Sequence, residues 1–299
     1  MLNLPRTGRR LLRPAAGILA GFLLLELLIF LLQSVFAHRT PQFFPDWEAQ
    51  DLSAVLEQDR LQPGDYDLIF TQTGLAPAAV DELRSYGSGG LDYIRQIQEA
   101  FFQPVPAECQ ELLPGRFTCE DILVDGEGRD VEAAPLAPML PGDIMVSFST
   151  HSVGWRHGHA GLVLAPLQQV TLEAVQLGMN TYAPYATHWS KYSNFMILRV
   201  RDADWETRVD TVRFAVEHLY DIPYSLLAGV FGPKEQRDPD RLTAQCAYLP
   251  WRAWLESGLD LDSDGGRIVT IADLAESRAL EVVQVYGIDP HLLLDRQAH

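Results

Sequence analysis

Basic residues are scarce in this chain of 299 residues, which has 23 Lys and Arg against 40 Asp and Glu and a formal net charge of −17. Proteins that bind nucleic acid neutralise its phosphates with a positive surplus, so nucleic acid is excluded as an expected partner. Extreme charge and low hydrophobicity are missing too, because 47% of residues are hydrophobic and 21% are charged. A mainly disordered chain is therefore excluded, and the length allows one or two domains with a proper core.

Charge is almost absent from residues 15–32, which contain eight Leu, two Ile, two Phe and one charged residue, Glu26. Arginines precede this run, and the insertion free energy of its apolar side chains outweighs the cost of Glu26. We therefore expect residues 1–37 to be a cytoplasmic tip and transmembrane anchor. The protein would then be a single-pass membrane protein whose catalytic domain is extracytoplasmic and whose one membrane contact is this helix.

A cleaved signal peptide is the alternative for the same segment, because Val35-Phe36-Ala37 resembles a small-residue cleavage site. The protein would then be secreted. No cysteine lies near this segment, so a lipoprotein anchor is not expected. A buried core helix is disfavoured because apolar residues cover every face.

Residues 38–135 are expected to form a tether and a helical cap region, with helical spacing of apolar residues in 46–62, 76–83 and 91–102, and with Pro63-Gly64-Asp65 as the stop of the first helix. Two of the three cysteines, Cys109 and Cys119, lie in this region with nine residues between them. Outside the cytoplasm such a pair is expected to form a disulfide worth about 3 kcal/mol. Two free buried thiols are the alternative.

The pattern of residues 136–299 changes to strands followed by helices, which predicts an α+β domain rather than a parallel sheet. The expected strands are 144–148, 159–165, 170–175 and 195–200, followed by a helix over 205–220 and another that begins near Cys246.

Two of these strands, 159–165 and 170–175, predict a hairpin around Pro166. If the pairing is symmetric about Pro166, His159 stands opposite Glu173 with Cβ atoms about 5 Å apart. Alternation assigns the apolar residues to the core face and places His159 and Glu173 together on the other face. Such a carboxylate would fix the histidine tautomer and raise its basicity. An ordinary surface pair is the alternative.

Cys246 directly precedes apolar residues at helical spacing, so it is expected in the first turn of a helix, where the dipole favours a thiolate. Cys, His and a carboxylate together activate a thiol for acyl transfer. A small buried hydrophobe is the alternative interpretation of Cys246. Pro250 removes the N–H that would bond the Cys246 carbonyl, so a kink near the nucleophile is also expected.

The order of these motifs resembles that of NlpC-type papain-like cysteine hydrolases. In the circularly permuted branch that contains the YiiX/YebB-like proteins, the His strand precedes the Cys helix, as it does here. The segments that carry this resemblance within 141–287 are Pro141-Gly142-Asp143, Trp155 to His159, Thr171 to Val175, Ile222 to Ser225, Gln245-Cys246 and Leu259 to Gly266.

The resemblance implies a permuted papain-like fold, an antiparallel sheet packed on helices. It further implies Cys246 as nucleophile, His159 as base and Glu173 as the residue that orients it. Tyr224 would lie near the oxyanion hole, and Gln245 would support the site. The implied reaction is hydrolysis of an amide bond in a cell-envelope peptide, first of all in peptidoglycan. A lipid acyl hydrolase or acyltransferase on the same fold is one alternative, and an inactive binding module is another.

No metal or other cofactor is expected. The spacing of the histidines in 151–159 matches no specific zinc pattern. Residues 260–265 match the first half of a calcium loop, but Ile271 takes the twelfth position, so a solvated turn is preferred. The sequence does not indicate the oligomeric state.

Overall fold

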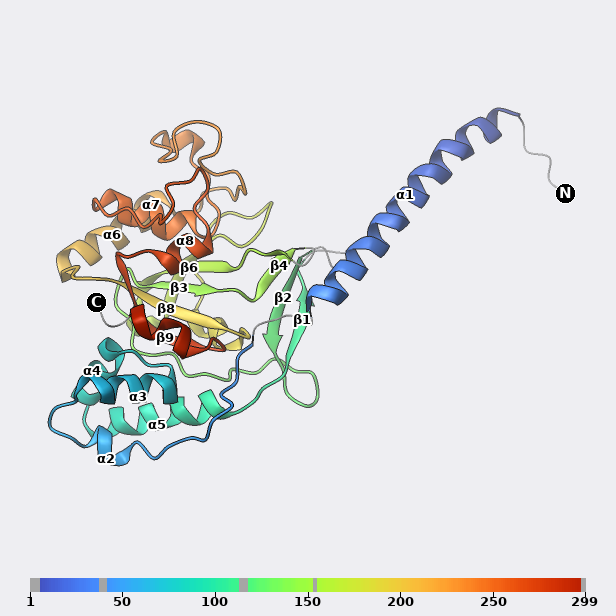
Figure 1. Cartoon of the computed structure of the whole chain (residues 1–299). Helices are drawn as coiled ribbons and strands as arrows, with labels where there is room; N and C mark the ends of the chain where they lie inside the picture. The colour runs from blue at the N-terminus through green and yellow to red at the C-terminus, as the bar shows by residue number, and fades with distance from the viewer. Residues whose placement is uncertain (1–5, 38–41, 113–117, 153–154, 297–299) are drawn as a thin grey trace.

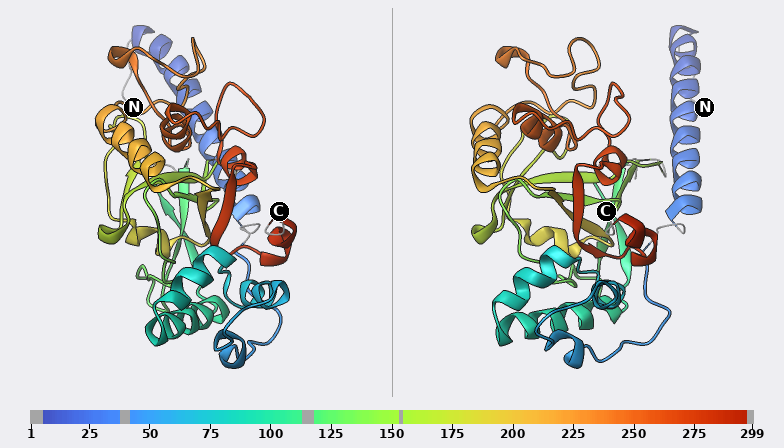
Figure 2. Two further views of the ribbon diagram at one scale, coloured as in Figure 1. Left: turned by 90° about the vertical axis from the view of Figure 1, so that its left-hand side faces the viewer. Right: turned by 60° about the vertical axis from the view of Figure 1, so that its left-hand side comes forward.

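The computed structural model describes residues 6–37, 42–112, 118–152 and 155–296. Its centre is a five-stranded antiparallel sheet in the order β7-β6-β3-β8-β9, and a smaller antiparallel sheet has the order β1-β2-β4-β5. Figures 1 and 2 show α6–α8 over one face of the large sheet and α2–α5 over the other. The α+β class expected from the sequence is therefore what the structure has.

The strands are β1 (Ala107–Glu111), β2 (Thr118–Leu123), β3 (Ile144–Ser147), β4 (Thr150–Ser152), β5 (Trp155–Arg156), β6 (His159–Ala165), β7 (Val170–Glu173), β8 (Phe195–Val200) and β9 (Leu280–Tyr286). The α-helices are α1 (Arg6–Ala37), α2 (Ser53–Leu56), α3 (Pro63–Thr73), α4 (Pro77–Ser85), α5 (Ser88–Phe102), α6 (Trp205–His218), α7 (Tyr248–Glu256) and α8 (Ile271–Glu276). Short 3-10 helices include η2 (Pro166–Gln168) and η3 (Ala186–Lys191).

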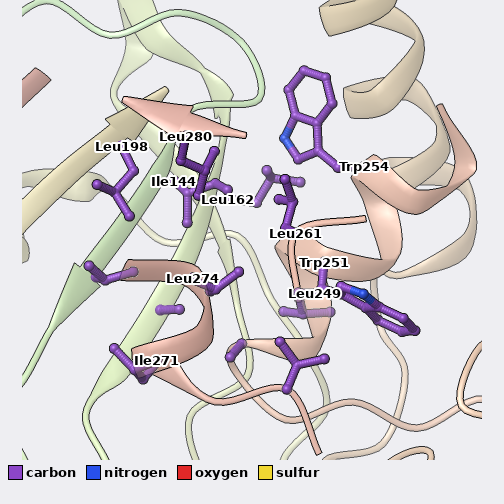
Figure 3. Packing of buried hydrophobic residues seen from close by; sticks show 14 of the residues in the cluster. Ile144, Leu162, Leu198, Leu249, Trp251, Trp254, Leu261, Ile271, Leu274 and Leu280 are labelled. Carbon is purple, nitrogen blue, oxygen red and sulfur yellow. The ribbon is translucent and has the colours of Figure 1, made fainter. Parts of the chain in front are cut away.

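Hydrophobic cores lie on both faces of the large sheet. Ile144, Leu162 and Leu198 belong to one core, together with Trp254 of α7 and Leu274 of α8. Figure 3 shows these side chains between the strands and the two helices. Side chains alternate along a strand. The neighbours Met145, Val163 and Ile197 therefore belong to the other core, which α3–α5 share. This sheet is consequently buried on both faces, and its polar side chains must find partners inside the protein.

The N-terminal helix α1 corrects the membrane prediction. In the part of the chain that the structure describes, no helix combines the length and the apolarity that a membrane crossing demands. A segment that crosses the hydrocarbon core needs about 20 consecutive apolar residues with few or no charges, and Glu26 interrupts the apolar run of α1. The expected transmembrane anchor and the single-pass localisation derived from it are therefore wrong.

The region before the sheet differs from the sequence pattern at its first helix. The expected helix over 46–62 is reduced to α2, and the chain starts α3 at Pro63, where a stop was expected. Proline suits the first helical position because its N–H would have no helical partner there. Gln62 and Asp65 form a reciprocal capping box around it. The start signal in this sequence was therefore mistaken for a stop signal.

Candidate active site

The β6–β7 hairpin has a different register from the symmetric one expected. Gly161, rather than His159, lies opposite Glu173, and the pairing is irregular between Val163 and Ala165. A slip of two residues leaves every side chain on its original face. His159 and Glu173 are therefore diagonal neighbours on the same face, and His159 Nε2 lies 2.7 Å from Glu173 Oε2.

Glu173 is a buried carboxylate, 1% exposed, with partners on both oxygens. Thr171 Oγ1 and Trp189 Nε1 donate to Oε1 at 2.6 and 2.9 Å. His188 Nε2 lies 3.3 Å from Oε2, beside His159. Burial alone would raise the pKa of Glu173, but the hydrogen bonds and charges of the two histidines outweigh it and hold that pKa well below its usual range. Glu173 is thus an anion able to orient an imidazole.

Trp189 fixes the plane of the His159 ring. The two rings are stacked, with centroids 5.3 Å apart and planes at 13°. Gly161 leaves the space that this stack needs, because a Cβ at that position would lie 3.1 Å from Trp189 Cζ2 and 3.2 Å from Glu173 Cγ. Sequence reasoning missed Trp189 and His188, since η3 lies between strands where no apolar periodicity marks a function.

His159 lies between Glu173 and Cys246. Nε2 faces Glu173, so the other ring nitrogen, Nδ1, is left for the hydrogen bond with Cys246. Burial would lower the pKa of His159, but hydrogen bonding to Cys246 and Glu173 and their charges raise it well above the usual value. The imidazole is therefore suited to carry a proton between the carboxylate and the sulfur.

Cys246 is half-buried, a free thiol, and lies just outside α7 rather than in its first turn. The helix begins at Tyr248, with Ala247 as its cap. Pro250 is thus the third helical residue, where the backbone N–H has no helical partner to lose. The Cys246 carbonyl accepts instead from Leu249 N at 3.4 Å. The reason for expecting a kink therefore does not hold, because α7 starts at Tyr248, later than expected.

Gln245 supports the loop that carries Cys246. Its Oε1 accepts from Ala247 N at 2.8 Å and from Cys246 Sγ at 3.5 Å, while Nε2 donates to Val269 O at 2.5 Å. Because a backbone N–H can only donate, the oxygen of the amide is the end beside the sulfur. Gln245 therefore positions the loop and does not present a donor to the thiol.

A cavity of about 380 Å³ joins the catalytic candidates, with His159, Glu173, Tyr224 and Cys246 on its wall. Burial, followed by the nearby Cys246, raises the pKa of Tyr224, so its hydroxyl stays protonated as a donor. Glu120 of β2 also lines the cavity, and no Lys or Arg is among the described residues that do so.

The other sequence candidates are separate from this cavity or have protein partners. Cys109 and Cys119 are joined by a disulfide between β1 and β2. His157 Nε2 lies 2.9 Å from Ser152 Oγ, so it does not join His159 in a zinc set. In the acidic loop, Asp262 forms an ion pair with Lys234 and accepts backbone N–H groups of the turn.

Comparisons with known proteins give one distant likeness. No protein-family model and no curated protein matches the sequence. Among solved structures, the chain is similar to the metalloprotein YiiX from Escherichia coli O157:H7, with a TM-score of 0.39 and 13% identity. The match covers 49% of this chain and 97% of that one. The permuted papain-like fold consequently stays a prediction from the motifs of this sequence.

Proposed function

We propose that this protein is a cysteine hydrolase that cleaves an amide bond through Cys246, His159 and Glu173. The observation that supports it most is the placement of His159, stacked on Trp189, between a buried carboxylate and the free thiol. A base held by an orienting carboxylate and facing a nucleophile is the arrangement that activates thiols for acyl transfer.

The proposed reaction has two halves. His159 Nδ1 takes the proton of Cys246, and the thiolate sulfur attacks the carbonyl carbon of the substrate. The tetrahedral intermediate collapses as His159 returns the proton to the leaving amine, which breaks the amide bond and leaves a thioester. A water molecule then gives its proton to His159 and attacks the thioester, and the sulfur departs as the carboxylic acid is released. Glu173 keeps the imidazole oriented throughout.

Stabilisation of the oxyanion is assigned to the backbone N–H of Cys246 and the hydroxyl of Tyr224. A preorganised donor aimed at the developing charge is typically worth about 10²–10³ in rate. Tyr224 suits this role because it lines the same cavity as Cys246 and retains its proton. A Tyr224→Phe variant, which keeps the ring and removes the donor, isolates this contribution.

A peptide is the preferred substrate class. The cavity of about 380 Å³ is lined by Glu120, three histidines and several tyrosines beside apolar residues such as Leu112 and Val175, and the carboxylate and imidazole groups offer peptide amides hydrogen-bond partners that a long acyl chain could not use. Its volume is at the small end of the range for ligand pockets, about 300–1,000 Å³. A peptide of the cell envelope, such as the stem peptide of peptidoglycan, is accordingly the first candidate.

The region 38–135 is proposed to narrow the cleft through its strands and not through its helices. Its helices α3–α5 cover one face of the large sheet, whereas β2 supplies Glu120 to the cavity wall. Glu120 on β2 would thus restrict access to the cavity that contains Cys246.

The test compares purified full chain with its Cys246→Ala and Tyr224→Phe variants on muropeptides and on acyl lipids, with products identified by mass spectrometry. We expect new amino and carboxyl termini from muropeptides, none with Cys246→Ala, and a rate lowered by about 10²-fold with Tyr224→Phe. Turnover of lipids alone would favour the acyl hydrolase. Turnover of neither, with muropeptide binding retained, would favour a binding module.

A further inference from the structure

A second cluster of metal-ligand side chains lies in the smaller sheet. Cys109 on β1, Cys119 on β2 and His151 on β4 each offer one ligand atom, and the three atoms lie within 4.8 Å of one another. Cys119 and His151 are direct partners in the β2–β4 register, and Cys109 reaches Cys119 through the disulfide. Three chain segments therefore bring two sulfurs and an imidazole to one point.

His151 has the environment of an oriented ligand. It is 1% exposed, and among the described residues neither Nδ1 nor Nε2 has a hydrogen-bond partner. Its Nε2 lies 3.4 Å from Asp121 Oδ1. Leaving a buried nitrogen without a partner costs about 1–3 kcal/mol, whereas a carboxylate on one ring nitrogen and a metal on the other is the usual setting of a metal-binding histidine. The ring is thus already oriented for a ligand that the disulfide form does not hold.

We infer that reduction of the Cys109–Cys119 disulfide converts this cluster into a zinc site. A dithiol reductant would transfer two electrons and two protons to the disulfide, giving two thiols and becoming a disulfide itself. Zn²⁺ would then bind the two sulfurs as thiolates, with release of two protons, and the neutral imidazole of His151. Cys109 is exposed, so the reductant and the ion can reach the pair.

The position of the site gives it a structural consequence. Glu120 follows Cys119 on β2, and Thr150 precedes His151 on β4. Both Glu120 and Thr150 line the cavity that contains Cys246. Because neighbouring side chains on a strand face opposite ways, the cluster lies behind that wall. The disulfide links β1 to β2 only, whereas a zinc ion would also link β4. The inference does not depend on the proposed hydrolase activity.

Zinc binding of the full chain tests this inference. A Cys246→Ala background leaves Cys109 and Cys119 as the only thiols. One sample stays oxidised. In the other a phosphine reduces the disulfide, giving two thiols and a phosphine oxide whose oxygen comes from water. Both samples are titrated with Zn²⁺ against a chromophoric indicator. We expect one Zn²⁺ per reduced chain and none per oxidised chain. Co²⁺ should give thiolate charge-transfer absorption in the reduced form alone.

Two further variants locate the ion. Cys109→Ser changes an exposed strand residue and is expected to weaken zinc binding at least tenfold without unfolding the chain. His151→Gln, checked for folding by circular dichroism, is expected to do the same. The inference is overturned if the reduced chain binds no zinc, if the oxidised chain binds it equally, or if binding persists unchanged in both variants.

Discussion

Two buried carboxylates, Glu173 and Asp143, have opposite kinds of partner. Both are at most 1% exposed. Asp143, just before β3, accepts from Arg199 Nη2 at 2.7 Å and from Arg208 Nη1 at 3.2 Å. Glu173, at the end of β7, has imidazoles in place of guanidinium groups, with His159 the nearer.

The type of partner therefore separates the carboxylate with arginine partners from the one for which we propose a catalytic role. Arginine is always charged in proteins, so the two cations around Asp143 persist as pH rises, and the network holds the β3 turn, β8 and α6 together. Histidine can release and accept a proton near neutral pH. Burial and negative charge are common to both sites, so neither property by itself indicates function.

The largest expected effect is on catalysis at Glu173. Glu173→Gln should lower kcat/KM by roughly 10⁴-fold, as removal of the orienting carboxylate does in other triads, because the amide can no longer stabilise the imidazolium. The measurement is hydrolysis of the substrate found with wild type, with thermal melting as the check on folding. A loss below tenfold would mean that Glu173 does not orient His159.

The matching change at Asp143 should act on stability instead. Asp143→Asn leaves Arg199 and Arg208 buried without their carboxylate, which should lower the free energy of unfolding by about 3–5 kcal/mol. Urea denaturation measures this loss. Activity per folded molecule should stay near the wild-type level. A loss of activity comparable with that of Glu173→Gln would show that the two carboxylates do not differ in role.

A larger side chain at Gly161, next to the stacked rings of His159 and Trp189, should have an intermediate effect on kcat. In Gly161→Ala the new Cβ must displace Trp189 or Glu173 by a few tenths of an ångström, since both lie within 3.1–3.2 Å of it. Overpacking of this kind costs about 1–3 kcal/mol, and the tilt of the imidazole should lower kcat more than it raises KM. Steady-state kinetics with both parameters unchanged would show that the stack does not position His159.

The smallest effect is the pH dependence of stability. The pKa of His159 is raised in the folded chain, so its contribution is present below the unfolded value, about 6.5, and is lost as pH rises through the folded pKa. Glu173 has a lowered pKa, so its contribution is present above about 4.5 and is lost as pH falls.

Wild type should therefore lose about 1 kcal/mol or more relative to Glu173→Gln as pH rises from about 6.5 to about 9. Urea titrations at a series of pH values give this difference. The Asp143 network should show no such alkaline loss, since arginine keeps its proton there. A difference that does not change with pH would contradict the His159–Glu173 coupling.

Alternation along the strands was enough to place His159 and Glu173 on one face, although the expected register was wrong by two residues. A two-residue slip preserves the face, so this inference tolerated the error in the turn. The start of α7 was less predictable, because Ala247 offers no capping side chain. The prediction of a helix over 46–62 was wrong because Pro63 starts α3 and does not end a helix before it.

Long-range neighbours could not be inferred from spacing. Trp189 reaches His159 from η3, and β9 enters the large sheet beside β8 from the end of the chain. Nothing local marks either contact. The proximity of Cys246 to His159 was expected only from the resemblance in motif order, since the 3.6-residue and two-residue periods describe faces within one element.

The most direct test of the Cys246–His159 pair is the rate of Cys246 alkylation by iodoacetamide from about pH 5 to about pH 9, in wild type and in His159→Ala. The disulfide leaves Cys246 as the free thiol, so mass spectrometry reports it alone. We predict rapid labelling that changes little between about pH 6 and about pH 8, because a protonated His159 accompanies the thiolate. In His159→Ala, labelling should be slower at neutral pH and rise steadily with pH. Equal rates and equal pH profiles in the two proteins would contradict an activated pair.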